Sequence, residues 1–199
     1  MRMFRNALGG AAMALALGFA GQAAAQEARS LQLSKVVMDT ETSEVTAKVK
    51  GGTLCVFSSK VKFTKEKKTQ DYERFDNLFT GRLKSSGFAV VSTSGEMFAV
   101  GDETKGDYLV AVTLRPTDVN LCSSVKGIKG NYTLSAEWQI YDRAAGKVVE
   151  SVTTTGLGTQ EKFAQDGLEQ LVNLAFTASL ASLVEKGVIQ KYAGAGGTP

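Results

Sequence analysis

The stretch that decides the fold runs from Leu134 to Thr155 and reads LSAEWQIYDRAAGKVVESVTTT. In its first half, apolar residues alternate with polar ones, as in an antiparallel strand with one buried face and one wet face. The turn-forming residues Asp142 to Lys147 come next, and a β-branched run begins at Val148. We therefore predict a β-hairpin. Its polar positions, which form a candidate partner-binding face, are Ser135, Glu137, Gln139 and Tyr141.

Two other segments have apolar side chains at the three- and four-residue spacing that predicts amphipathic helices. The first is 70–86, and Gly87 follows it as a stop signal. The second begins at Leu168 and ends at Gly187. The apolar stripe of the first helix is Tyr72, Phe75, Phe79 and Leu83, and that of the second includes Leu171, Ala175, Phe176, Leu180 and Leu183. We expect both stripes to belong to the core.

Short apolar or alternating runs predict further strands at 53–57, 88–92 and 108–114. Pro116 ends the last of them or confines it to an edge of the sheet. With the hairpin this gives a mixed or antiparallel sheet of about five strands. Two helices on one face of the sheet make an α+β two-layer sandwich. In this organisation residues 53–190 form a single α+β domain. Residues 26–50 are a polar amino-terminal arm with one or two edge strands, 156–165 a linker, and 191–199 a flexible tail.

The first 25 residues have the pattern of a secretory signal peptide. Arg2 and Arg5 precede an apolar run, and small residues end at Ala25, so that cleavage leaves Gln26 as the amino terminus. The apolar run is shorter than the ~20 residues that span a bilayer, and we expect no transmembrane segment in the mature chain. Without its signal peptide the chain carries 21 − 20 = +1 net charge, which gives no attraction to nucleic acid. We expect a periplasmic or secreted protein.

Cys55 and Cys122 are the two cysteines of the chain. An even count in an exported protein favours one disulfide, because the compartment is oxidising. The alternative is two buried free thiols, which pack as small hydrophobic groups. A bridge would close a loop of 122 − 55 = 67 residues and stabilise the fold by about 4 kcal/mol in the chain-entropy model.

The chain lacks the residues that several kinds of catalysis and metal binding require. The chain contains no histidine, which removes Ser-His-Asp and Cys-His catalysis and the usual zinc sites. Asp102 and Glu103 are adjacent, but they lack the further oxygen donors of a calcium loop. Ser59 and Lys62 form the one Ser/Lys pair worth testing, without the other motifs of such enzymes. We expect no catalysis, no metal and no cofactor.

Lysines crowd residues 60–68, at Lys60, Lys62, Lys65, Lys67 and Lys68. Such a run binds phosphate or carboxylate groups in some proteins and is a solvated surface in most. The sequence leaves both possibilities open.

Two motifs resemble a known family. Gly106-Asp107-Tyr108-Leu109-Val110 and the hairpin from Trp138 to Val149 are similar to the amino-terminal domain of TolB and to curli-secretion-channel modules. The hairpin also resembles a domain that precedes trypsin-like peptidases in some exported proteins. That domain has two cysteines, and Cys55 and Cys122 of this chain match their positions. The resemblance covers about residues 53 to 186. It implies a periplasmic adaptor or assembly role, without catalysis by this module.

The sequence thus predicts a non-enzymatic periplasmic binding or assembly domain that acts on another periplasmic or outer-membrane protein of the cell envelope. The alternative is a protein that binds a small ligand or a glycan through Trp138. Because the neighbours of Trp138 on its own strand face are all apolar, we expect its ring to lie in the core.

Overall fold

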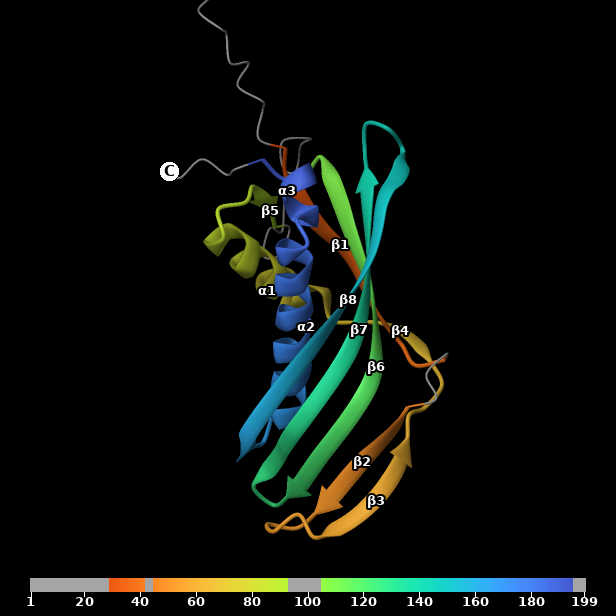
Figure 1. Ribbon diagram of the computed structural model, residues 1–199, viewed down its shortest axis with the longest axis vertical. Helices are drawn as coiled ribbons and strands as arrows, with labels where there is room; N and C mark the ends of the chain where they lie inside the picture. Colours follow the sequence, from red (N-terminus) through yellow and green to blue (C-terminus); the bar gives the residue numbers. More distant parts are fainter. Residues whose placement is uncertain (1–28, 42–44, 93–104, 195–199) are drawn as a thin grey trace, which may run out of the picture.

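The computed structural model describes residues 29–41, 45–92 and 105–194, which form one mixed sheet with helices (Figure 1). The expected signal peptide, the Asp102–Glu103 pair and residues 195–199 lie outside the described residues. The strands are β1 Leu31–Asp39, β2 Thr46–Gly51, β3 Phe57–Lys62, β4 Lys67–Thr69, β5 Val90–Val91, β6 Tyr108–Ser124, β7 Gly127–Asp142 and β8 Lys147–Ala164. The helices are α1 Tyr72–Ser85, α2 Gly167–Glu185 and α3 Val188–Tyr192.

An α+β fold is therefore confirmed, but the sheet has eight strands where about five were expected. Three long antiparallel strands, β6, β7 and β8, form its body. On the other side of β6, β1 and β2 lie one after the other along its length, and both are parallel to it. The short strands extend this side further, with β4 and β5 beside β1, and β3 beside β2.

The predicted hairpin is β7 with β8, and Trp138 lies opposite Val152 in its register. Its turn is closed by Asp142, whose Oδ1 accepts a hydrogen bond of 2.9 Å from the Ala145 N–H. Both strands are longer than expected. The segment 156–165, interpreted as a linker, continues β8 as far as Ala164. Likewise β6 does not end at Pro116, because a shift of register between Pro116 and Asp118 lets the pairing with β7 continue.

The amino-terminal arm predicted at 26–50 included one or two edge strands, and an edge position is wrong for β1. This strand lies between β6 and β4, and Leu31 and Leu33 are fully buried. A register irregularity between Leu33 and Lys35 moves the next buried residue to Val36. The irregularity interrupts the period-two pattern on which strand prediction depends, so the buried strand looked like a weakly alternating arm.

The strand predicted at 53–57 is also wrong. Residues 52–55 make the turn between β2 and β3, and Phe57 begins β3. The side chains of Leu54 and Phe57 are 81% and 77% exposed. A short apolar run does not by itself distinguish a buried strand from an exposed turn. Most such runs are buried, but nothing in the run requires burial.

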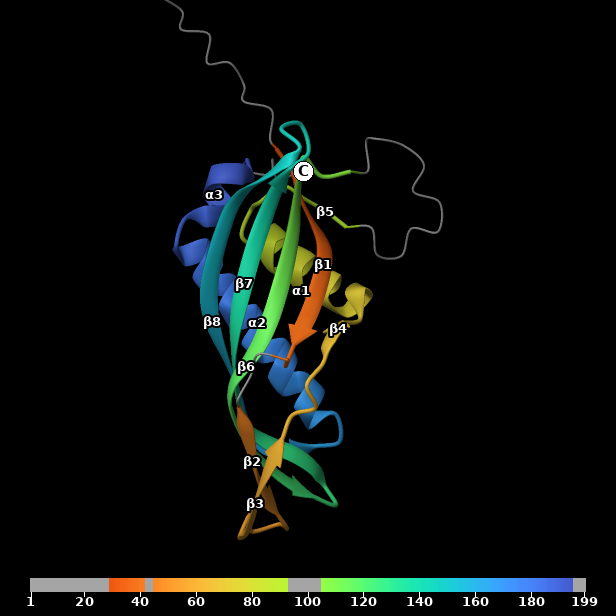
Figure 2. The same ribbon diagram turned by 90° about the vertical axis from the view of Figure 1, so that its right-hand side faces the viewer.

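Both predicted helices are present and lie on the same side of the sheet (Figures 1 and 2). Phe176 of α2 is central to the core, with its ring 4.9 Å from that of Phe75 on α1 and 5.6 Å from that of Trp138 on β7. By length and composition α2 could cross a membrane, the one such helix among the described residues. Here it packs against β7 and β8.

Residues 191–194, which fall in the flexible tail predicted at 191–199, are held by contacts with the rest of the fold. Ala193 is buried, and its N–H donates to the Ile189 carbonyl. The Gly194 N–H donates to Arg29, and the Gly194 carbonyl accepts from Ala89. Residues 191–194 thus join two distant segments of the chain.

Candidate functional site

The four predicted face residues lie together on β7, on the side of the sheet that faces away from Trp138. Glu137 has Thr113 and Thr153 as cross-strand neighbours, and these polar side chains share one face. Gln139 and Tyr141 are exposed, and Ser135 and Glu137 are half-buried. Since α1 and α2 lie on the opposite side of the sheet, the described helices leave this face open (Figure 1).

Arg115 forms ion pairs with Glu137, on the open face, and with Asp39. Its Nη1 donates to Glu137 Oε2 over 2.9 Å, and its Nε donates to Asp39 Oδ2 over 3.1 Å. The Asp39 side chain is only 5% exposed, so this guanidinium also partners a buried carboxylate. The hydrogen bond with Glu137 is the main cause that raises the pKa of Arg115, and burial opposes it. The same hydrogen bond is the main cause that lowers the pKa of Glu137.

A pH-dependent contribution to stability follows from the lowered pKa of Glu137. A carboxylate with a depressed folded-state pKa stabilises the protein above its ordinary value of 4.5, and the effect is lost as pH falls through the lower value. We expect Glu137→Gln to lower the free energy of unfolding by up to about 1 kcal/mol at neutral pH, and by much less in strong acid. Urea unfolding at the two pH values measures the difference.

Arg115→Gln provides the control for this prediction. In that background the dominant cause of the shift is absent, so Glu137→Gln should have nearly the same effect at both pH values. An equally strong pH dependence in both backgrounds would contradict the assignment.

Trp138 is a core residue, as its neighbours indicated. It is 1% exposed, and its Nε1 donates to Thr154 Oγ1 over 2.8 Å. The Thr154 hydroxyl in turn donates to the Ser179 carbonyl of α2. The ring is therefore not available to stack on a sugar or a small ligand.

The Ser59–Lys62 pair is not assembled. Both residues lie on β3, and residues three apart in a strand point to opposite faces of the sheet. The Ser59 hydroxyl donates to the Val49 carbonyl over 3.3 Å. The lysine run is likewise divided, with Lys60 and Lys62 on β3 and Lys67 and Lys68 on β4.

The Gly106-Asp107-Tyr108 motif has a structural role in this protein. Asp107 Oδ2 accepts hydrogen bonds from the Ser30 N–H and hydroxyl, over 2.7 and 3.0 Å. Gly106 lies against Gln32, and a Cβ on it would be 2.8 Å from the Cβ of Gln32. The motif therefore joins the start of β6 to the start of β1.

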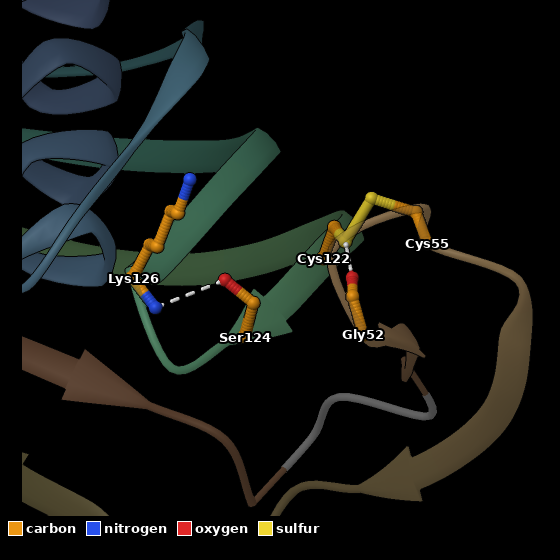
Figure 3. Close-up of a disulfide and its surroundings, with 5 residues drawn as sticks. All are labelled: Gly52, Cys55, Cys122, Ser124 and Lys126. Carbon is orange, nitrogen blue, oxygen red and sulfur yellow. Dashed lines mark hydrogen bonds between the residues drawn. A yellow bond between two sulfur atoms is a disulfide. The ribbon is translucent and has the colours of Figure 1, made fainter.

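The predicted disulfide joins Cys55, in the β2–β3 turn, to Cys122 on β6, with 5.5 Å between the Cα atoms (Figure 3). This excludes the alternative of two free thiols. The Gly52 N–H also donates to the Ser123 carbonyl over 3.0 Å. The β2–β3 turn is thus held against the end of β6, next to the β6–β7 turn that contains Lys126.

Sequence reasoning missed a second site on the open face, beside the disulfide. It is a hollow of about 640 Å³. Its lining includes Lys48, Lys50, Lys129, Asn120, Asn131 and the two half-cystines. The signal was present in the sequence as two lysines two residues apart, Lys48 and Lys50. Residues two apart in a strand share a face, but this spacing is informative only once the strands are known.

Comparisons with known proteins identify no family for this chain. No protein-family model matches the sequence, and no curated protein matches it. Solved structures with some likeness include a Xanthomonas campestris protein of the family DUF330, at 14% identity and a TM-score of 0.42, covering 82% of this chain and 86% of that one. A hypothetical protein from Chlamydia trachomatis has 11% identity and a TM-score of 0.42, covering 83% and 97%. A lipoprotein from Neisseria meningitidis has 13% identity and a TM-score of 0.32, covering 82% and 97%.

These TM-scores are all below 0.5, so the likeness carries no argument about the function of this chain. The resemblance to TolB, to curli-secretion-channel modules and to the domain before exported peptidases is not confirmed.

Proposed function

We propose that this chain is a non-enzymatic binding or adaptor module of the cell envelope, which binds a periplasmic or outer-membrane protein through its open sheet face. The observation that carries the proposal is the asymmetry of the sheet. One face is covered by α1 and α2, and the other presents Ser135, Glu137, Gln139 and Tyr141 without a covering helix (Figure 1).

The chemistry of the open face suits a protein partner. Hydroxyl, amide and phenol groups surround an arginine that two carboxylates hold in place. Such a fixed set of donors and acceptors can bind polar groups of a partner without first being ordered, and this lowers the entropic cost of association. Tyr141 adds an exposed aromatic side chain of the kind enriched in protein interfaces.

Export supports the same proposal. The amino-terminal pattern is that of a signal peptide, and the Cys55–Cys122 disulfide is stable in the oxidising compartment to which that signal would deliver the chain. The alternative of a glycan or small-ligand protein loses its aromatic platform, because Trp138 is buried.

Site-specific photo-crosslinking in the producing cells tests the proposal. A photoactivatable phenylalanine analogue at position 139 on the open face should give one discrete adduct with an envelope protein. The same analogue at position 77, an exposed residue of α1, should not give that adduct. Equal labelling from both positions, or no discrete adduct from position 139, would exclude the open face as the binding surface.

A further inference from the structure

Two turns that are far apart in the sequence meet at one end of the molecule. The β2–β3 turn and the β6–β7 turn both lie at the end opposite the β7–β8 turn (Figures 1 and 2). The disulfide and the pairing of Gly51 with Ser123 hold the two turns side by side. We call this region the basic–apolar end. It consists of the apolar residues Leu54, Val56, Phe57 and Val125 and the lysines Lys48, Lys50, Lys60, Lys62, Lys126 and Lys129.

The apolar side chains of this end are strongly exposed. Val125 is 91% exposed, Leu54 81% and Phe57 77%. Leaving large apolar side chains in water forgoes about 1.5–3 kcal/mol of burial energy for each. When several such side chains gather at one place, they mark an interaction site.

The lysines of this end are crowded onto one face. Lys48 lies directly opposite Lys60 in the β2–β3 pair, and Lys50 is paired with Cys122, which in turn lies opposite Lys129. Like charges directly across a sheet destabilise it. Neither residues 46–62 nor residues 121–131 contain an aspartate or a glutamate. Glu161 of β8 is a carboxylate that lines the hollow together with the three lysines Lys48, Lys50 and Lys129. The local charge is therefore positive, although the mature chain is nearly neutral.

We propose that the basic–apolar end docks on an anionic phospholipid surface. Exposed leucine, phenylalanine and valine side chains at the tip would enter the boundary between headgroups and acyl chains. The lysines behind them would contact the phosphate groups, with their aliphatic stems along the apolar layer. Each lysine near such a surface strengthens binding about fivefold, which makes the lysines and the apolar tip comparable contributors.

Charge selects this occupant over a second copy of the chain. A symmetric dimer through the basic–apolar end would bring lysines of one copy against lysines of the other, and this repulsion costs stability. An anionic bilayer has an apolar layer bordered by negatively charged phosphates. The apolar layer can take up the apolar tip of the protein, and the phosphates can contact the lysines behind it. The proposal does not depend on the protein-binding function proposed above.

Vesicle sedimentation tests the proposal with the mature chain and its intact disulfide. We expect binding to vesicles made of equal parts phosphatidylcholine and phosphatidylglycerol, and much weaker binding to pure phosphatidylcholine. The double variant Leu54→Ser, Phe57→Ser and the double variant Lys48→Gln, Lys60→Gln should each bind the anionic vesicles at least about tenfold more weakly than the wild type. Added salt should weaken binding, and soluble glycerol phosphate at the same phosphate concentration should not displace the protein.

Matched controls are available at the other end of the sheet. Val148 is an exposed apolar residue beside the β7–β8 turn, and Lys147 is the exposed lysine next to it. Val148→Ser and Lys147→Gln should leave vesicle binding unchanged. The emission of buried Trp138 reports whether every variant is folded.

Four outcomes would overturn the proposal. They are no binding to anionic vesicles, equal binding to neutral vesicles, displacement by glycerol phosphate, and folded double variants that bind like the wild type. Self-association in the absence of vesicles that Leu54→Ser, Phe57→Ser abolishes would instead assign the basic–apolar end to a second copy.

Discussion

Replacing Gly156 with alanine is expected to lower the free energy of unfolding by about 3 kcal/mol or more, a large fraction of the stability of a domain of this size. The reason is the close approach of α2 to β8. A Cβ on Gly156 would lie 1.9 Å from the Ala175 carbonyl oxygen of the helix, and one on Gly158 would lie 2.0 Å from that of Leu171. Backbone atoms cannot rotate away as a side chain can, so the helix must move off the sheet.

Urea unfolding measures this effect, and Gly81→Ala is its control. Gly81 is an exposed residue within α1, and a Cβ there has nothing within 4 Å. Alanine favours helix over glycine, so Gly81→Ala should raise the free energy of unfolding by about 0.5–1 kcal/mol. Similar effects of the same sign at both positions would show that α2 does not lie as close to β8 as described.

Removing the disulfide with Cys55→Ser, Cys122→Ser is expected to lower the free energy of unfolding by about 4 kcal/mol. The bridge closes a loop of 67 residues, and its loss frees the unfolded chain of that constraint. The folded protein keeps the pairing of β2 with β6, so the fold itself should persist. Urea unfolding of the double variant beside the wild type gives the value.

Reduction supplies the control for this measurement. A thiol reductant should lower the unfolding midpoint of the wild type toward that of the double variant and leave the variant unchanged. A wild type that is insensitive to complete reduction would show that the constraint contributes nothing to stability.

The elements that could be predicted from the sequence were those whose apolar residues recur with a regular period. The alternation from Leu134 to Tyr141 predicted β7 and its two faces, and the three- and four-residue spacing predicted α1 and α2. The sequence predicted edge strands in 26–50 but not the place of β1 inside the sheet, because a bulge after Leu33 breaks its alternation. The second half of β8 was missed because Gly156 and Gly158 look like linker residues. In the structure their lack of a side chain lets α2 pack closely against β8.

The candidate site was predictable in part for a related reason. The polar face of β7 is local, since one strand contains all four residues. The basic–apolar end combines β2, β3 and the β6–β7 turn, and only the three-dimensional pairing brings Lys48, Lys60 and Lys129 together. The apolar run at 53–57 was interpreted as a buried strand, so its exposure could not be foreseen from composition.

The unbroken length of β7 gives the molecule the character of a spacer. With 16 residues at about 3.3 Å each, the strand separates the β6–β7 turn from the β7–β8 turn by up to about 50 Å. A protein resting on a bilayer by its basic–apolar end would hold Gly146 at about that height above the headgroups. Any partner on the open face would then be bound at a defined distance from the lipid. Lengthening or shortening the three long strands together would change that distance.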